Sequence, residues 1–277
     1  MPELPEVQTI VNDLIANDVI NRTIVRVEVF WSKTIGDMKT ETFQKKVSGQ
    51  TIQNIRRRAK YIIFDFAAQW HLLIHLRMSG RLYLVPCSII RNKHEHVVLH
   101  LSDNRDLRFQ DTRKFGRMIL TENPAAFLKD LGPEPLSSEF TVARFQKMLK
   151  SKNRQLKPLL LDQTFIAGLG NIYTDEALWR ARLHPLTIAA TLTPYKISAL
   201  HTAIRFVLQQ GIDNQGTSLG DGQSNFASAE NRRGNNARNL MVFHRTDQEC
   251  PRCGTKIKRI IVGQRSTHIC PKCQKHP

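Results

Sequence analysis

Four of the five cysteines form two close pairs near the end of the chain, Cys250-x2-Cys253 and Cys270-x2-Cys273. Two C-x2-C pairs separated by 16 residues place four thiolates within reach of one tetrahedral zinc ion. Disulfides are disfavoured because the N-terminus shows no secretory signal, and a redox C-x-x-C motif would not be expected twice in one basic hairpin. The pattern therefore predicts one structural Zn2+, because four thiolates leave no open position for chemistry.

The chain is strongly basic. It has 277 residues, with 41 Lys and Arg against 24 Asp and Glu, which gives a formal net charge of +17. A folded chain with this surplus needs a polyanionic partner, and nucleic acid is favoured over an acidic membrane surface because no amphipathic basic helix with a bulky apolar face is evident. No apolar run reaches the ~18 residues that span a bilayer, so we expect a cytoplasmic protein without membrane contact.

The first half of the chain is predicted to be rich in β-strands behind one leading helix. From Pro5 to about Val19 apolar residues recur on one helical face. From Thr23 the period changes to two, and short strand-like runs continue to about Leu120, which indicates a sandwich or barrel. The clearest runs are 61–66, 71–76, 81–85, 97–101 and 107–109.

The second half is predicted to be helical, which makes the whole chain an α+β protein. Candidate helices cover about 141–150, 155–162, 171–180 and 194–210. Gly168-Leu169-Gly170-Asn171 is expected to be a tight turn between two of them. Residues 213–239 are rich in Gly, Ser, Asn and Gln and have almost no apolar periodicity, so we expect a long mobile loop there.

The N-terminus offers a nucleophile. Removal of Met1 before the small Pro2 would free a secondary amine, and an α-amino group with a pKa of about 7.7–8.0 is partly neutral near pH 7. Such an amine can form a Schiff base with a sugar aldehyde carbon. Glu3 and Glu6 lie beside it, where a proton must be moved. By itself Pro2 is more often an ordinary start residue, so this interpretation depends on the rest of the chain.

Seven segments, in order along the chain, carry a resemblance to one family. They are Pro2-Glu3-Leu4-Pro5-Glu6-Val7, Arg58-Ala59-Lys60-Tyr61, His75-Leu76-Arg77-Met78-Ser79-Gly80, Asp111-Thr112-Arg113-Lys114-Phe115-Gly116, Leu131-Gly132-Pro133-Glu134-Pro135, Lys157 through Leu178, and Val262-Gly263-Gln264-Arg265 with the four cysteines. Together they resemble the bacterial formamidopyrimidine-DNA glycosylases of the wider endonuclease VIII superfamily. Leu4 matches the glycosylase branch, since the endonuclease VIII branch usually has Gly there.

The resemblance implies a bifunctional DNA glycosylase and abasic-site lyase of base excision repair. Its partner would be double-stranded DNA that contains an oxidised base or an abasic site, and the protein would be a nucleoid-associated monomer. The implied domains are an N-terminal catalytic β-sandwich (1–130), a helix-two-turns-helix DNA-binding domain (131–240) and a four-cysteine zinc-finger β-hairpin (241–277). The loop at about 213–239 would cover a flipped purine.

By the same resemblance, Pro2 attacks C1′ of the damaged deoxynucleotide after the base has been flipped out of the stack. Glu3 would be the acid and base at the sugar, and Glu6 would be a positioning group. The iminium acidifies the C2′ protons, so the 3′ phosphate and then the 5′ phosphate are eliminated. Lys60 and Arg265 would hold phosphates. The alternatives are a capping carboxylate for Glu6 and solvated surface cations for Lys60 and Arg265.

The resemblance also implies a set of DNA contacts. Met78, Arg113 and Phe115 would fill the gap left by the base, because an apolar wedge compensates lost stacking and Arg can pair with the orphaned base edge. Core packing is the alternative for Met78 and Phe115. The remaining implied contacts are Lys157, Asn171 and His94. For Lys157 the alternative is a helix-surface charge, and for Asn171 it is helix capping.

Several positions depart from the family pattern. Phe243-His244-Arg245 replaces the usual Tyr-Gly-Arg, so a phenol that would reach a phosphate is absent, and His268-Ile269 replaces an aromatic pair. The loop at 216–239 keeps Thr217-Ser218 but is otherwise atypical, which leaves the preferred lesion open.

Oxidised purines, formamidopyrimidines and 8-oxoguanine, are the favoured substrates. The alternatives are an endonuclease VIII-like glycosylase for oxidised pyrimidines and a catalytically silent DNA-damage binding protein. Intact Pro2, Glu3 and Lys60 count against the silent binder.

Overall fold

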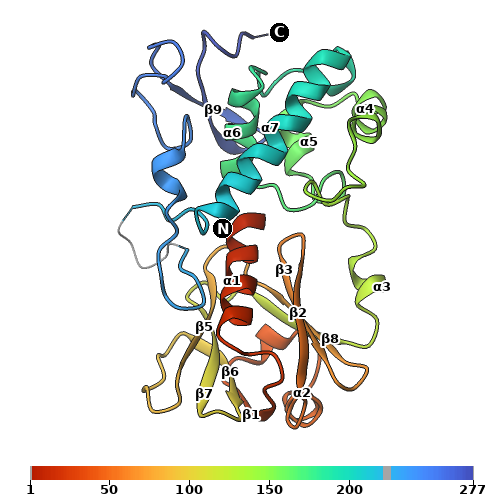
Figure 1. Ribbon diagram of the computed structural model, residues 1–277, viewed down its shortest axis with the longest axis vertical. Helices are drawn as coiled ribbons and strands as arrows, with labels where there is room; N and C mark the ends of the chain where they lie inside the picture. Colours follow the sequence, from red (N-terminus) through yellow and green to blue (C-terminus); the bar gives the residue numbers. More distant parts are fainter. Residues whose placement is uncertain (1, 221–225, 277) are drawn as a thin grey trace. The chain divides into compact units, whose positions relative to one another are not determined.

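The computed structural model describes residues 2–220 and 226–276, which form two compact units. The first unit contains the chain up to Lys129 and the segment Asn214–Ala237, and the second contains Asp130–Asp213 and the chain from Arg238 onward (Figure 1). Among the described residues, no helix is both long enough and apolar enough to cross a membrane. The division into three domains at residues 130 and 240 stays a prediction.

The first unit is built from two four-stranded antiparallel sheets, and it confirms the predicted α+β fold with an N-terminal β-sandwich. One sheet has the order β1 (Ile24–Val29), β6 (Glu95–Leu101), β7 (Arg105–Asp111), β5 (Gly80–Pro86). The other has the order β2 (Ile52–Arg58), β3 (Tyr61–Phe66), β4 (His71–His75), β8 (Arg117–Thr121). The remaining elements are α1 (Leu4–Ala16), α2 (Thr40–Val47), α3 (Pro124–Leu128) and the 3-10 turn η1 (Ser32–Ile35).

The leading helix α1 is fixed by the apolar face that its sequence predicts. Val7, Ile10 and Leu14 are fully buried in one hydrophobic core with residues from both sheets, such as Phe64 and Phe109. Burying such side chains contributes roughly 1.5–3 kcal/mol each. The start of α1, which carries the candidate nucleophile, is therefore attached to the rigid sandwich.

Strand β2 and helix α2 were missed by the sequence analysis. The run Arg56-Arg57-Arg58 has no apolar pattern, yet it forms the end of β2. Arg56 pairs with Asp65 on the neighbouring strand, with Nε 2.7 Å from Oδ2. Cross-strand charge pairing of this kind lets a cationic run form a strand that its apolar pattern does not predict.

The second unit carries the predicted helices and a C-terminal β-hairpin. The helices are α4 (Val142–Lys150), α5 (Leu156–Leu161), α6 (Asn171–Arg180) and α7 (Pro194–Asp213), with the 3-10 turn η2 (Ala189–Thr191). A further 3-10 turn, η3 (Asn236–Asn239), begins in the segment of the first unit and ends in the second. The hairpin pairs β9 (Lys258–Val262) with β10 (Arg265–Ile269). Helices α6 and α7 meet at Gly211, where a Cβ would lie 2.5 Å from the phenol oxygen of Tyr173.

The segment predicted as a mobile loop, 213–239, is irregular over most of its described residues, but part of it is packed. Ala229 is fully buried in the core of the sandwich, and its carbonyl accepts the Leu84 N–H at 2.9 Å. Residues 221–225 of this loop lie outside the described residues. Small residues at 227–229 allow this packing without the apolar periodicity that sequence analysis relies on.

Candidate active site and zinc centre

Pro2 and Glu3 lie buried at the start of helix α1. Glu3 is the N-cap residue, and its backbone N–H donates to Glu6 Oε2 at 2.8 Å, while its own carboxylate accepts the Glu6 N–H. This reciprocal capping box fixes the backbone beside the Pro2 nitrogen. The helix N-terminus also favours the negative charge of both carboxylates. A carboxyl group is therefore held one residue away from the candidate nucleophile.

Glu6 does more than cap the helix. It is 1% exposed, and its Oε1 accepts the backbone N–H of Thr217 at 2.8 Å. One carboxylate therefore joins the Glu3 backbone to the segment that follows α7. The capping and positioning interpretations of Glu6 both describe contacts that this side chain makes.

Lys60 lies in the turn between β2 and β3, and it is only 5% exposed. It follows Ala59, whose φ of +53° belongs to the left-handed region. Arg57 donates to the Ala59 carbonyl at 3.0 Å and to Gln8 Oε1 on α1 at 2.9 Å. Gln8 thus helps to hold the Lys60 turn near the start of α1.

His75, at the end of β4, is affected by the charge of Lys60. Burial, with the charges of Arg77 and Lys60, lowers the pKa of His75 to about 3. Its Nδ1 accepts the Arg77 N–H at 3.0 Å, and its ring packs edge-on against Tyr61 with centroids 4.6 Å apart. The ring is neutral at pH 7, so Nε2 carries a proton that can be donated to an anion. The sequence analysis quoted His75 within a motif but gave it no role.

Met78, Arg113 and Phe115 come together at the surface of the first unit. Arg113 Nη1 lies 3.6 Å from Met78 Sδ, and the guanidinium lies 4.9 Å from the centroid of the Phe115 ring. Met78 is 42% exposed and Phe115 is 48% exposed, so neither is part of the core. The structure therefore brings the three residues predicted as a wedge together at one exposed place.

The fully buried Asp111 organises the loops that carry Met78, Arg113 and Phe115. Its Oδ1 accepts the Ser79 hydroxyl at 2.5 Å and the Arg113 N–H at 3.1 Å, and its Oδ2 accepts the Gly116 N–H at 2.7 Å. The Asp111 N–H donates to the carbonyl of His94 at 2.9 Å, which places His94 beside the same loops. This role of Asp111 was not predicted from the sequence. The local signal for it is an acidic residue directly before a Thr-Arg-Lys-Phe-Gly turn, where such side chains often accept backbone N–H groups.

The four paired cysteines gather at one point of the second unit. Their sulfur atoms all lie within 4.8 Å of one another, with separations of 3.4 Å between Cys253 and Cys270 and 4.0 Å between Cys250 and Cys273. A tetrahedron of Zn–S bonds of about 2.3 Å has edges of about 3.8 Å, so the cluster fits one zinc ion. Trp179 Nε1 donates to Cys250 Sγ at 3.4 Å and links the site to α6.

Arg265 lies at the exposed tip of the zinc hairpin. Gly263 and Gln264 form the turn before it with φ of +54° and +61°, as a two-residue hairpin turn of type I′ requires. The next residue, Ser266, offers its carbonyl to Asn171 Nδ2 at 2.9 Å and to Lys157 Nζ at 3.0 Å. Three predicted DNA contacts therefore converge on one end of the hairpin.

Lys157 and Asn171 nevertheless differ from simple surface contacts. Lys157 is fully buried, and Nζ lies 2.6 Å from Asp175 Oδ1. In this conformation its ammonium is enclosed by protein, so a direct phosphate contact would require the hairpin to open. Asn171 is the first residue of α6, and its Oδ1 is buried without a hydrogen-bond partner.

The residues that depart from the family pattern pack against one another. Phe243 stacks on His244 with centroids 4.8 Å apart, and His268 packs edge-on against Phe243 at 5.0 Å. Glu176 on α6 holds this cluster, because its carboxylate accepts the N–H groups of Val242 and Phe243 at 2.9 and 2.8 Å. Burial raises the pKa of Glu176. The replacements Phe243, His244 and His268 therefore form one group of side chains that pack against one another.

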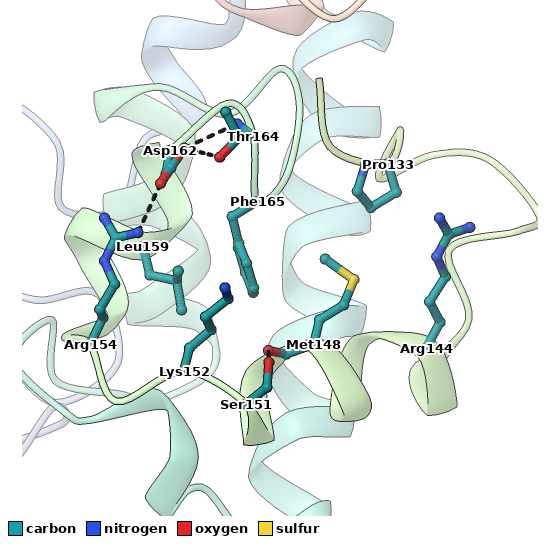
Figure 2. A pocket seen from close by; sticks show the side chains of 10 residues that line it. All are labelled: Pro133, Arg144, Met148, Ser151, Lys152, Arg154, Leu159, Asp162, Thr164 and Phe165. Atoms are coloured by element: carbon teal, nitrogen blue, oxygen red, sulfur yellow. Dashed lines mark hydrogen bonds and ion pairs between the residues drawn. The ribbon is translucent and has the colours of Figure 1, made fainter. Parts of the chain in front are cut away.

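A hollow of about 400 Å3 lies elsewhere in the second unit (Figure 2). Arg144, Lys152 and Arg154 line it together with Met148 and Phe165, and Asp162 holds Arg154 with Oδ2 2.8 Å from Nη1. None of the predicted site residues lines this hollow.

Comparison with known proteins gives the same assignment along the whole chain. Residues 1–118 match the formamidopyrimidine-DNA glycosylase N-terminal domain, residues 131–222 match the formamidopyrimidine-DNA glycosylase H2TH domain, and residues 247–275 match a zinc finger found in FPG and IleRS. The formamidopyrimidine-DNA glycosylase of Protochlamydia amoebophila (strain UWE25) is 46% identical over 99% of this chain and 100% of its own length. That of Roseiflexus sp. (strain RS-1) is 43% identical over 99% of this chain and 100% of its own length.

Solved structures agree. The Lactococcus lactis enzyme in complex with DNA that contains an abasic site is 36% identical, with a TM-score of 0.90 over 99% of this chain and 100% of that one. The wild-type L. lactis enzyme bound to DNA that contains N7-benzyl-Fapy-dG matches with the same identity, coverage and TM-score. With domain matches along the chain and full-length relatives above 40% identity, this chain belongs to the formamidopyrimidine-DNA glycosylase family.

Proposed function

We propose that this chain excises oxidised purines, formamidopyrimidines and 8-oxoguanine, from double-stranded DNA and then cleaves the resulting abasic site through Pro2. The observation that carries the proposal is the capping box at the start of α1, which holds the Glu3 carboxyl beside the Pro2 nitrogen in a buried setting. The related L. lactis enzyme binds both Fapy-dG-type and abasic DNA, which are the substrates of the two halves of this reaction.

Pro2 is the nucleophile once Met1 has been removed. Its nitrogen lone pair bonds to C1′ as the bond from C1′ to the damaged base breaks, and the base leaves with a proton. Glu3 moves protons at the sugar, where a positioned acid or base is worth about 10²–10⁴-fold. Opening of the sugar ring gives an iminium between Pro2 and C1′. Loss of a C2′ proton then expels the 3′ phosphate, and a second elimination expels the 5′ phosphate.

The other residues bind the substrate. Lys60 and Arg265 hold phosphates, and the proton on His75 Nε2 adds a neutral donor beside Lys60. Met78, Arg113 and Phe115 occupy the place of the flipped nucleotide. Further contacts come from Asn171, His94 and the hairpin that Lys157 supports. The zinc ion carries no step of the reaction: it holds the hairpin that presents Arg265.

We also infer that the chain works as a cytoplasmic, nucleoid-associated monomer in three domains, 1–130, 131–240 and 241–277. Its charge of +17 favours contact with DNA.

A panel of duplexes with single lesions tests this function. Each duplex carries a formamidopyrimidine, 8-oxoguanine, an oxidised pyrimidine or an abasic site, and cleavage is measured at both ends of the gap. We expect purine lesions to be cut well, with phosphate left on both sides of the gap. Preference for oxidised pyrimidines would instead indicate endonuclease VIII-like specificity, and binding without cleavage would indicate a silent damage binder.

A further inference from the structure

Residues 226–236 belong to the first unit and pack against its strand β5 and helix α1. We call this segment the strap. The Leu84 N–H of β5 donates to the carbonyl of Ala229 at 2.9 Å, and Arg81 Nη2 donates to Asn231 Oδ1 at 2.7 Å. Asn231 adopts a φ of +61°, and the Ser228 N–H donates to the Arg232 carbonyl at 2.8 Å, which closes a tight turn. The strap is thus held by backbone as well as side-chain contacts.

An ion pair attaches this turn to helix α1. Arg232 Nη2 lies 2.8 Å from Asp13 Oδ1, and Arg232 Nε lies 2.8 Å from Glu230 Oε2. Glu230 in turn accepts a hydrogen bond from Asn17 Nδ2, at the C-cap of α1, at 2.5 Å. The Asp13 side chain is only 7% exposed, and its Oδ2 is buried without a hydrogen-bond partner. Arg232 therefore neutralises a nearly buried charge, and its loss would leave that charge uncompensated.

The other end of the strap lies against residues 216–218. Gly234 donates its N–H to Ser218 Oγ at 2.9 Å, and Asn236 Nδ2 donates to Thr217 Oγ1 at 3.0 Å. The approach is close, because a Cβ on Gly234 would lie 2.3 Å from the carbonyl oxygen of Gly216. Movement of the strap would therefore move the backbone at Thr217.

Thr217 connects this arrangement to the reaction centre. Its N–H donates to Glu6 Oε1, and Glu6 Oε2 accepts the N–H of Glu3. A continuous series of contacts therefore runs from the ion pair on α1, through the strap and Thr217, to the backbone beside Pro2. All of these residues belong to the first unit.

We propose that Asp13 and Arg232 are positioning residues that fix the strap, and with it the Thr217 backbone, as a preformed wall of the pocket for the damaged base. This proposal rests on the proposed function and adds to it a determinant of base excision outside the wedge and the capping box. Excision needs the base held in its pocket while the bond to C1′ breaks. An abasic site has no base, so its cleavage does not need this wall. Loss of the Asp13–Arg232 pair should therefore slow excision of the base and leave cleavage of an abasic site nearly unchanged.

The test compares Arg232→Ala, Arg232→Lys and Asp13→Asn with the natural chain. Single-turnover excision from a duplex with one formamidopyrimidine is measured beside cleavage of a preformed abasic site. Because a hydrogen bond to a charged group is involved, we expect excision by Arg232→Ala to fall about tenfold. Abasic cleavage should stay within about twofold. Arg232→Lys should recover part of the loss, and adding Asp13→Asn to Arg232→Ala should cost little more, since the two residues act as a pair.

Arg22→Ala is the matched control. Arg22 also pairs with a carboxylate of the first unit, with Nε 3.1 Å from Asp103 Oδ2, and it is similarly exposed. Its loss should leave both activities unchanged. Equal losses of excision and abasic cleavage in Arg232→Ala, or no loss of excision, would overturn the proposal.

A second measurement does not depend on activity. Amide hydrogen exchange at residues 216–218 should quicken in Arg232→Ala but not in Arg22→Ala, at temperatures well below the unfolding of either variant. Unchanged hydrogen-exchange protection at Thr217 in Arg232→Ala would overturn the proposed role of Asp13 and Arg232, even if the lesion panel supports the proposed function. Conversely, faster exchange in a chain that excises no lesion would support the strap and reject the proposed function.

Discussion

Lys157 Nζ lies 2.6 Å from Asp175 Oδ1, and both side chains are fully enclosed by protein. Asp175 also accepts the backbone N–H of His268 at 2.9 Å, and Lys157 donates to the carbonyl of Ser266. A buried ion pair on α5 and α6 thus fixes strand β10, whose first residue is the exposed Arg265. Lys157, which was predicted to contact DNA itself, therefore supports the strand that carries Arg265, another predicted DNA contact.

Lys157 and Arg265 should therefore give different defects. Lys157→Ala leaves a buried carboxylate unpaired, which we expect to lower the free energy of unfolding by about 3–5 kcal/mol. Arg265→Ala should leave stability unchanged and reduce the slope of log affinity against log salt by about one. Chemical denaturation and DNA titrations at several salt concentrations measure the two effects. A normal stability for Lys157→Ala, with a reduced salt slope, would favour direct phosphate contact instead.

Glu3→Gln should separate the two halves of the reaction. Base removal needs a proton moved as the bond from C1′ breaks, whereas an abasic sugar already offers an aldehyde to Pro2. We expect excision to fall by about 10²–10⁴-fold, with substantial cleavage at a preformed abasic site. The amide is nearly isosteric, so DNA binding serves as the control. Equal losses in both assays, with binding intact, would show that Glu3 serves elimination as much as base release.

Alanine in place of Met78, Arg113 or Phe115 should impair excision from duplex DNA more than cleavage of an abasic site, because these residues assist base flipping. Since Met78 and Phe115 are about half exposed, neither replacement should lower the melting temperature appreciably. Thermal denaturation of the three variants checks this point. A large loss of stability in Met78→Ala would restore the core-packing interpretation.

His75 should make stability depend on acidity. Its pKa falls from an ordinary 6.5 to about 3 in the folded chain. Between these two pH values the unfolded chain therefore binds a proton at His75 that the folded chain does not bind. The contribution of the neutral His75 ring to the free energy of unfolding is present above pH 6.5. It is lost as pH falls toward 3, by at most about 1.4 kcal/mol per pH unit. His75→Asn keeps an acceptor for the Arg77 N–H and should show a shallower decline over this range. Parallel curves for both proteins would mean that His75 titrates normally.

Much of the architecture was predictable because local patterns encode it. The spacing of Cys250, Cys253, Cys270 and Cys273 requires that the four thiolates meet, and the structure brings them within reach of one ion. The apolar face of α1 and the short apolar runs of β3 to β7 indicate burial directly. The assignment of Met78 and Arg113 to one wedge came only from resemblance and stays a prediction, since nothing local shows that these side chains meet across 35 residues.

The supporting carboxylates could not be predicted. Asp175 holds a backbone N–H that lies 93 residues further along the chain, and Glu176 holds others 65–67 residues away. A backbone donor has no sequence signature, so a buried acid on a helix gives no sign of which strand it holds. The same is true of Asp13 and Arg232, which are separated by 219 residues and belong to segments with no shared pattern.

Pro2 should form a covalent bond with the sugar of an abasic site, and borohydride trapping detects this bond. The natural chain, with Met1 removed, should become covalently attached to duplex DNA that contains an abasic site when borohydride reduces the iminium. A version with an N-terminal extension that blocks the Pro2 nitrogen, and Pro2→Gly, should both still bind this DNA. Trapping should be almost abolished by the extension and sharply reduced by Pro2→Gly. Undiminished trapping of the extended protein would rule out Pro2 as the nucleophile, because another amine would then have to form the link.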